Sequence, residues 1–288
     1  MFDEQLARYR DMTENALREL PFDGTPDTLR EAMRYSLLSP GKRLRASLCL
    51  AACEAVSGSP DAALPFALSL EMIHAYSLIH DDLPAMDNDT LRRGLPTNHV
   101  VYGEAMAILA GDALLNAAFE NALQVPGERA RRALSALSRA SGSRGMVAGQ
   151  ALDILAEGTE PKKRKVVEIH RGKTAALITA AVETGLILGG CDEETLRAGQ
   201  EYGLHLGLAF QITDDLLDLA GDEKLLGKHT GKDEQENKMT WPACVGKEQA
   251  ERDAEEHARL AAEAAGKIGN GGSAFLAEMA QRTLKRKK

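Results

Sequence analysis

Apolar residues recur at helical spacing along most of the chain, and no stretch shows the strict alternation of a half-buried strand. Pro/Gly breaks at 21–26, 40–41 and 126–127 separate the periodic segments. The predicted helices cover 2–20, a segment ending near 38, a segment from about 42 to 56, 64–80, 103–123, 129–139, 144–156, 175–188 and 193–219. No repeat of fixed period appears, so the sequence predicts one all-α domain over 1–288.

The segment 64–80 is apolar nearly all round, which predicts a helix in the protein interior. Carboxylates follow it at once, at Asp81, Asp82 and Asp87. An ionised carboxylate is costly to bury without a partner, so we expect a cation beside them. Oxygen ligands without nearby cysteines favour a hard cation, magnesium before zinc. Arg92 and Arg93 follow shortly and indicate a phosphate-bearing substrate at the same metal.

A second acidic cluster ends the segment 193–219, where the sequence reads FQITDDLLD. Asp214 and Asp218 are four residues apart and project from one helix face. Asp81 and Asp87 are six apart, a rotation of about 120° on an unbroken helix. They can share a metal only if the helix loosens, which Pro84 favours. One cluster alone could be a solvated helix end, but two clusters favour a bridging metal site.

Four sequence stretches, taken in order, carry a family resemblance: GKRLR, DDLPAMD, DDLLD and LGKHTGKDEQENK. From about Leu38 onward the chain resembles the short-chain trans-prenyltransferases (isoprenyl diphosphate synthases), and most of all the bacterial farnesyl diphosphate synthases. The resemblance implies an isoprenoid-synthase-type bundle of about ten or more helices around a central cavity. It also implies a homodimer, with the two acidic clusters facing each other across the cavity mouth.

The resemblance also assigns site residues. The implied magnesium ligands are Asp81, Asp87 and Asp214, with Asp82 and Asp218 beside them. The residues implied to hold isopentenyl diphosphate are Lys42, Arg45, His74 and Arg93. The residues implied to act on the allylic diphosphate are Arg92, Lys173, Thr174, Gln211, Lys228 and Lys238. The resemblance further places Tyr76 and Ser77 against the growing prenyl chain.

Each basic group also has an ordinary interpretation when taken alone. The turn with Lys42 and Arg45 could be solvated, and His74 could be a satisfied core histidine. The segment 220–240 could be a charged loop. Beside two metal–phosphate clusters, a clamp for diphosphate is the better interpretation. We assign no chemistry to Gln150 or Asp153, which either support the site or join helices.

The expected reaction is the head-to-tail (1′-4) condensation of isopentenyl diphosphate with dimethylallyl or geranyl diphosphate. Magnesium assists departure of the allylic diphosphate, the double bond of isopentenyl diphosphate attacks the cation, and the released diphosphate takes the proton. A bulky Tyr76 five residues before Asp81 looks like the bacterial C15 pattern, which implies farnesyl diphosphate as product. The alternative is a geranylgeranyl diphosphate synthase. A terpene cyclase would not need the isopentenyl diphosphate clamp, and a non-catalytic regulatory subunit should lack one acidic cluster.

Composition and charge narrow the location and the partners. The net charge of −8, from 35 basic and 43 acidic residues, argues against a nucleic-acid binder. The basic run 162–165 has no interleaved aromatics, which favours a solvated helix start. No apolar run reaches the length of a membrane span, and 175–190 comes nearest. The four cysteines lack metal-ligand spacing and no signal peptide precedes them, so we expect reduced thiols in a cytoplasmic protein.

Overall fold

The computed structural model describes residues 2–219, 238–269 and 273–285. The helices are α1 (Phe2–Arg18), α2 (Asp27–Leu37), α3 (Leu44–Ser57), α4 (Leu64–Asp81), α5 (Asn98–Tyr102), α6 (Glu104–Leu123), α7 (Glu128–Ser141), α8 (Met146–Ala156), α9 (Lys163–His170), α10 (Ala176–Gly189), α11 (Glu193–Leu219), α14 (Trp241–Val245), α15 (Lys247–Ala265) and α16 (Ser273–Leu284). A 3-10 turn (Asp61–Ala63) precedes α4, and one π-helical turn (Arg171–Ala175) joins α9 to α10. The all-α prediction is confirmed.

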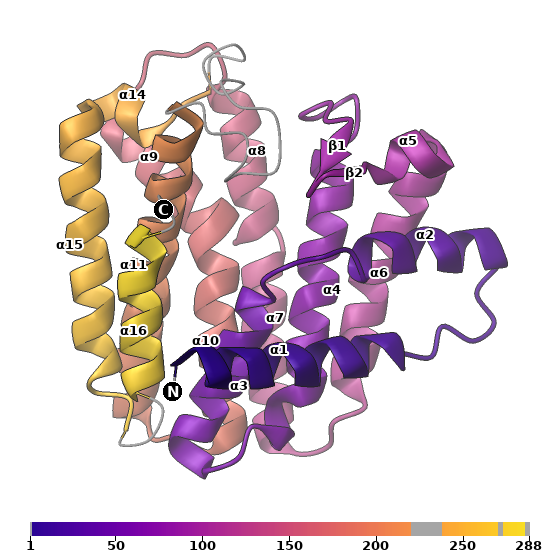
Figure 1. Cartoon of the computed structure of the whole chain (residues 1–288), viewed down its shortest axis with the longest axis horizontal. Coiled ribbons are helices and arrows are strands. Elements are labelled where there is room, and N and C mark those ends of the chain that lie inside the picture. The colour runs from indigo at the N-terminus through magenta and orange to yellow at the C-terminus, as the bar shows by residue number, and fades with distance from the viewer. Residues whose placement is uncertain (1, 220–237, 270–272, 286–288) are drawn as a thin grey trace.

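The long helices stand side by side as a bundle, and α1 and α2 lie across its front (Figure 1). The most extensive helix contacts join α11 with α15, α3 with α10, and α4 with α6. Helices α4 and α10 are buried on nearly all sides, as their continuous apolar sequence predicts. They place the end of α4 and the start of α10 inside the bundle.

One helical segment of the described residues, 61–81, is long and apolar enough to span a membrane by length and composition. Within it, 67% of the apolar window is buried inside the structure. A core helix meets the same criteria. The sequence instead predicts 175–190 as the segment nearest to a membrane span, and that prediction differs from the segment found in the structure.

Buried side chains form two apolar clusters. The larger one involves α1–α4, α6, α7, α10 and α16, together with the start of α8, the first half of α11 and the end of α15. The smaller one joins α8 and α9 to α11, α14 and α15, and its members are Ala156, Val166, Ile169, Leu208, Ile212, Leu216, Met239, Trp241, Ala250 and Ala254. This smaller cluster surrounds the part of α11 that carries the second acidic cluster.

The sequence predicts no strands, and this prediction is wrong at one place. Strands β1 (Leu91–Arg92) and β2 (Leu95–Pro96) pair as a two-residue hairpin. Arg93 and Gly94, the turn residues, both have positive φ, at 55° and 77°. Two positive φ angles match the twist of a tight hairpin, and Gly94 takes its angle without strain. Two-residue strands are too short to produce a recognisable alternation.

The glycine at 172, which the sequence places in mid-helix, permits a close approach of two backbones. A Cβ on Gly172 would lie 2.7 Å from the Cα of Gly149, and a Cβ on Gly149 would lie 1.9 Å from the amide nitrogen of Lys173. Helix α8 therefore packs directly on the π-helical turn. No other residue type fits at either position without a shift of the backbone that carries Lys173.

We expect Gly149→Ala to lower the free energy of unfolding by about 2 kcal/mol, because the added methyl overpacks the contact between α8 and the π-helical turn. Catalytic turnover should fall with it, since Lys173 must move. Chemical denaturation measures the first effect and a steady-state assay the second. Ala151→Ser, an exposed change on the same helix, is the matched control. An unfolding midpoint of Gly149→Ala equal to that of the control would contradict the argument.

Candidate active site

The two acidic clusters line one cavity. Its volume is about 180 Å³. The lining residues come from α4, α8, α9, α11 and the segments between helices, and they are Asp81, Asp87, Arg92, Asp153, Ile169, His170, Lys173, Gln211, Asp214, Asp215, Asp218, Lys238, Met239 and Thr240. The clusters are therefore brought together across 127 or more residues of sequence (214 − 87).

The end of α4 explains how Asp81 and Asp87 lie close together. The helix stops at Asp81, and Leu83 N–H donates to the His80 carbonyl in a tighter turn. The chain then folds back until the amide of Asp87 donates to the Asp81 carbonyl at 2.8 Å. The expected loosening of the helix is confirmed. Burial, followed by the nearby charge of Asp87, raises the pKa of Asp81, and Lys173 opposes this rise.

Asp82 points elsewhere. It accepts hydrogen bonds from Arg92, one from Nε at 2.9 Å and one from Nη2, and Arg92 also reaches Asp89 at 3.2 Å. Asp82 is buried and lines a second, smaller cavity rather than the one shared by the acidic clusters. Burial raises its pKa to about 6. This placement favours Asp82 as the residue that orients Arg92 and argues against a direct metal contact.

The second cluster divides in a similar way. Asp214 and Asp218 line the cavity, and one oxygen of Asp218 is buried without a hydrogen-bond partner among the described residues. Asp215, between them, accepts from Gln211 at 2.9 Å and from the amide of Trp241 at 2.8 Å. An unsatisfied buried carboxylate oxygen is costly, so Asp218 marks a place for a donor or a cation.

This donor set fits magnesium. Within the described ranges, no three His, Cys, Asp or Glu side chains lie close enough to enclose an ion by themselves. Magnesium is commonly held by one or two carboxylates together with water and substrate phosphates. Carboxylates spread along two walls of a cavity suit an ion that is completed by a phosphate ligand.

Two lysines offset the carboxylates. Lys173 Nζ lies 2.6 Å from Asp153, and Lys238 Nζ lies 3.0 Å from Asp87. Burial alone would lower the pKa of Lys173, but the charges of Asp153, Asp81 and Asp87 outweigh it and raise that pKa. Asp153, to which the sequence analysis assigned no chemistry, thus holds a lysine that faces the cavity. No local pattern in the sequence indicated this contact.

Thr174 supports a residue of the cavity wall, Gln211. The Thr174 hydroxyl donates to Gln211 Oε1 at 2.5 Å, and Gln211 in turn donates to Asp215. Thr174 is therefore the support of Gln211, which itself lines the cavity. Lys228, assigned to the same set from the sequence, lies outside the described residues.

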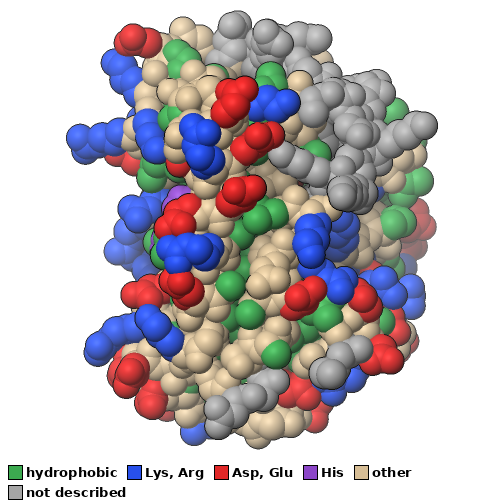
Figure 2. Space-filling view, turned by 60° about the vertical axis from the view of Figure 1, so that its left-hand side comes forward, with side chains coloured by type: hydrophobic (Ala, Val, Ile, Leu, Met, Phe, Trp, Pro, Cys, Tyr) green, Lys and Arg blue, Asp and Glu red, His purple; other side chains and the backbone are tan. Residues whose placement is uncertain are grey.

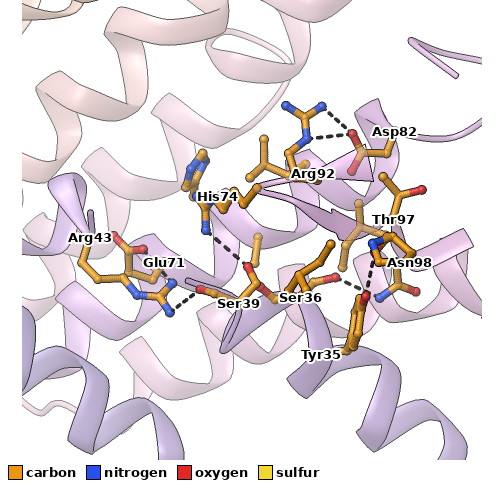
Figure 3. A pocket seen from close by; sticks show the side chains of 16 residues that line it. Tyr35, Ser36, Ser39, Arg43, Glu71, His74, Asp82, Arg92, Thr97 and Asn98 are labelled. Atoms are coloured by element: carbon orange, nitrogen blue, oxygen red, sulfur yellow. Dashed lines mark hydrogen bonds and ion pairs between the residues drawn. The ribbon is translucent and has the colours of Figure 1, made fainter. Parts of the chain in front are cut away.

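The smaller cavity, of about 30 Å³, is lined by His74 and by arginines (Figure 3). Arg43, Arg92 and Arg93 all face it. Burial, and then the charges of Arg45 and Arg93, lower the pKa of His74 well below its usual value. The His74 ring is therefore neutral at pH 7 and can serve this pocket only through hydrogen bonds.

In the part of the chain that the structure describes, Arg45 and Lys42 do not line this cavity. Burial lowers the pKa of Arg45 to about 10, while Glu71 opposes the shift, and Arg45 Nε has no hydrogen-bond partner among the described residues. Lys42 is exposed. A buried guanidinium nitrogen without a partner remains available to an anion, which keeps the prediction for Arg45 open.

Arg43, between those two residues, was missed by the sequence analysis. Its side chain is 3% exposed; it donates to Glu14 Oε1 at 2.7 Å and to the Ser39 carbonyl at 3.0 Å, and lies 3.5 Å from Glu71. Glu71 also accepts from the Ala46 amide in the first turn of α3. Arg43 has φ 47°, an unfavourable angle for a side chain with a Cβ. The buried ion pairs hold this loop in place.

Tyr76 and Ser77 lie on α4 one turn before Asp81. Ser77 donates to the His74 carbonyl. Tyr76 is buried, its ring packs edge-on against His80 at 5.7 Å, and its hydroxyl has no partner among the described residues. Burial, and then the charge of Asp81, raise the pKa of Tyr76 to about 12. His80 in turn contacts α6, so Tyr76 packs where α4 meets α6.

A family model described as polyprenyl synthetase matches residues 26–269. The chain belongs to the polyprenyl synthetase family. Farnesyl diphosphate synthase of Geobacillus stearothermophilus is 48% identical over 225 residues, which are 76% of this chain and 76% of that protein. Geranylgeranyl pyrophosphate synthase 11 of Arabidopsis thaliana is 48% identical over 247 residues, which are 83% of this chain and 69% of that protein.

Solved structures agree. A geranyltransferase of Helicobacter pylori, complexed with magnesium and isoprenyl diphosphate, has a TM-score of 0.84 and 34% identity over 98% of this chain and 96% of that one. An FPP/GFPP synthase of Zymomonas mobilis has a TM-score of 0.85 and 33% identity over 98% of each chain. The fold is that of the isoprenoid synthases, and the chain is a prenyltransferase of the trans-prenyl diphosphate synthase type.

We expect Arg43→Gln to raise the KM for isopentenyl diphosphate by about tenfold while changing the KM for the allylic substrate little, because the loop that carries Lys42 and Arg45 loses its buried anchor. Leaving Glu71 unpaired should also cost about 3 kcal/mol of unfolding free energy. Steady-state kinetics with each substrate varied in turn measures the first effect. Arg43→Lys should recover part of it, and Arg10→Ala, on an exposed arginine of α1, is the control. Reduced stability with both KM values unchanged would restrict Arg43 to a structural role.

Proposed function

We propose that the chain condenses isopentenyl diphosphate with dimethylallyl or geranyl diphosphate, head to tail (1′-4), with farnesyl diphosphate as the main product and magnesium as cofactor. The observation that carries the proposal is the single cavity in which both acidic clusters meet Lys173 and Lys238. Beside it lies a smaller cavity lined by His74 and arginines. The larger, acidic cavity would bind the diphosphate that leaves. The smaller cavity would bind the diphosphate that isopentenyl diphosphate keeps.

In this proposal Asp81, Asp87 and Asp214 hold magnesium at the larger cavity, with Asp218 beside them. Bound magnesium neutralises the leaving diphosphate and so lowers the barrier to ionisation. Lys173 and Lys238 add fixed positive charge at the same place, and Arg92, oriented by Asp82, lines both cavities. These groups act on the departing charge and form no covalent bond.

The isopentenyl diphosphate would be held by Lys42, Arg45, His74 and Arg93. Arg93 donates to Ser39 at 3.3 Å and packs on Gly41, where a Cβ would lie 2.7 Å from its guanidinium. The arginine is thereby fixed against the loop that carries the other basic groups. The double bond then attacks the allylic cation that forms when the C–O bond to the leaving diphosphate breaks. A proton passes to the released diphosphate, since no side-chain base is evident.

The product length rests on Tyr76. Both farnesyl and geranylgeranyl diphosphate synthases are about equally similar to the chain, so the C20 product is the second candidate. Tyr76 lies five residues before Asp81, about 7.5 Å along α4. Its buried ring against His80 supports a floor that would stop a C15 chain.

We further propose a homodimer. Ile108 and Leu109 on α6 are 44% and 52% exposed, and Val147, Ile154 and Leu155 on α8 are also exposed. Large exposed apolar side chains in groups are typical of interaction sites. We expect Ile108→Lys with Leu109→Lys to convert a species of twice the monomer mass into the monomer in sedimentation experiments. A wild type that sediments as a monomer would contradict the proposal.

The reduced state of the cysteines supports a cytoplasmic location, which we also propose. Cys49, Cys53, Cys191 and Cys244 are all free thiols. Burial raises the pKa of Cys49 to about 12, so its thiol is unreactive.

We expect Asp81→Ala or Asp214→Ala to reduce turnover by about three orders of magnitude, because each removes part of the charge stabilisation of the leaving diphosphate. Chelation with EDTA should abolish turnover, and added magnesium should restore it. A continuous assay for released diphosphate measures both. Asp11→Ala, on an exposed carboxylate of α1, is the matched control. Turnover near that of wild type in either variant would refute the assigned mechanism.

We expect wild type to form mainly C15 product and Tyr76→Ala to shift it to C20 or longer, because removal of the ring opens space along α4. Chromatography of the dephosphorylated products, after incubation with isopentenyl diphosphate and each of three allylic primers, measures chain length. Tyr76→Phe, which keeps the ring, is the control and should keep the C15 product. A Tyr76→Ala enzyme that still stops at C15 would exclude Tyr76 as the floor.

A further inference from the structure

The sole tryptophan of the chain, Trp241, lies three residues after Lys238 and begins α14. It is 2% exposed. Both of its N–H groups donate to carboxylates. The backbone amide donates to Asp215 Oδ2 at 2.8 Å, and the indole Nε1 donates to Asp253 Oδ2 at 2.8 Å. Trp241 therefore links α11, which carries the second acidic cluster, to α15.

Asp253 is itself held from two further sides. Lys163 Nζ lies 3.0 Å from its Oδ2, and Gln249 Nε2 donates to its Oδ1 at 2.7 Å. Lys163 also lies 5.5 Å from the centre of the Trp241 ring, over which it makes a cation–π contact. Within the basic run at the start of α9, Lys163 is thus tied to a carboxylate of α15. On this side of the molecule acidic and basic side chains are interspersed, without one continuous charged patch (Figure 2).

Asp215 forms the other end of the link. It accepts from Gln211 at 2.9 Å, and His170 Nε2 lies 3.3 Å from it. The His170 ring also stacks on Trp241, with centroids 5.5 Å apart. Asp215 is the direct neighbour of Asp214, a predicted magnesium ligand. Trp241 is therefore held by the same turn of α11 that carries this ligand. A buried indole N–H normally finds an acceptor, and here that acceptor lies on α15 while the backbone amide of the same residue is held by α11.

Lys238 depends on this arrangement through the short chain between them. Three residues span at most about 10 Å, so fixing Trp241 limits where Lys238 can lie. Met239, between the two, is buried in the same small apolar cluster as Trp241, and the Thr240 hydroxyl accepts from the Ala243 amide. At the far end of this stretch Lys238 Nζ contacts Asp87, a residue of the first acidic cluster.

We infer that Trp241, held by Asp215 and Asp253, is a positioning residue that sets Lys238 at the diphosphate side of the acidic cavity. This inference rests on the proposed role of Lys238 toward the leaving diphosphate. Trp241 and Asp253 do not line the cavity itself. They act through the backbone of 238–241, and Asp253 lies on α15, outside every acidic motif of the sequence.

The test uses two variants that spare the fold. Asp253→Ala removes the indole acceptor at a site where the carboxylate is 16% exposed, and Trp241→Phe keeps a buried ring but removes the N–H donor. Glu263→Ala, on an exposed carboxylate of α15, is the matched control. Hydrogen–deuterium exchange of the metal-free full chain reports the peptide 238–246. We expect about tenfold faster exchange there in both variants and no change in the control.

Calorimetry with inorganic diphosphate and magnesium then measures binding without turnover. We expect Asp253→Ala and Trp241→Phe each to raise the Kd by about five- to tenfold, as Lys238→Ala does. In the Lys238→Ala background neither change should weaken binding further, because residues that act through one group are not additive. A purely structural role would instead multiply the two effects.

The outcomes separate the inference from the proposed function. Unchanged hydrogen exchange at 238–246 would overturn the positioning role of Trp241. So would losses of diphosphate affinity that multiply with that of Lys238→Ala. Neither result would affect the proposed prenyl transfer. A Lys238→Ala chain that binds diphosphate as wild type does would refute the role proposed for Lys238, and the inference with it. Non-additive losses with faster exchange support both.

Discussion

Mutual repulsion among carboxylates that are buried or half-buried in one cavity is the constraint on which this structure depends. Asp81, Asp87, Asp214 and Asp218 line one cavity, and burial raises the pKa of Asp81 there. Such a group of charges is unfavourable unless cations are held close by. Among the described residues, Lys173, Lys238 and Arg92 line this cavity, and the donor set fits magnesium in addition. The cations proposed to stabilise a leaving diphosphate are therefore the same cations that offset the repulsion among the carboxylates in the folded protein.

Carboxylates beside the basic side chains of the two cavities fix those charges in place. Asp153 holds Lys173, Asp82 holds Arg92, and Arg43 is held by carboxylates of α1 and α4. In each case a buried charge is paired and hydrogen-bonded, as burial demands. Preorganised charge does not have to reorganise when the allylic bond breaks, which is where such sites gain their rate. Trp241 extends the same principle to Lys238 through the backbone.

The adjacent aspartates show that a sequence motif does not indicate which of its members faces the cavity. Both DD pairs suggested metal ligands, but in each pair one member turns toward a protein partner. Asp82 pairs with Arg92, and Asp215 accepts from Gln211 and Trp241. Neighbouring residues on a helix differ by about 100° in direction, so both cannot face one ion. Which member turns inward depends on the helix register against its neighbours, and a motif does not contain that register.

By itself, the sequence determined the main helices as far as α11, the interior position of α4, and the two acidic clusters, because apolar periodicity and runs of carboxylates are local signals. Helices α15 and α16 were not among the predicted segments. It also carried the break after Asp81, since Pro84 cannot continue a helix. Only the tertiary structure decided the partners: Asp153 with Lys173, Glu14 with Arg43, and Trp241 with Asp253. The members of each pair lie 12 to 29 residues apart, on different elements of the fold. Such contacts are set by helix packing at close approaches such as Gly149 on Gly172, and no local pattern encodes them.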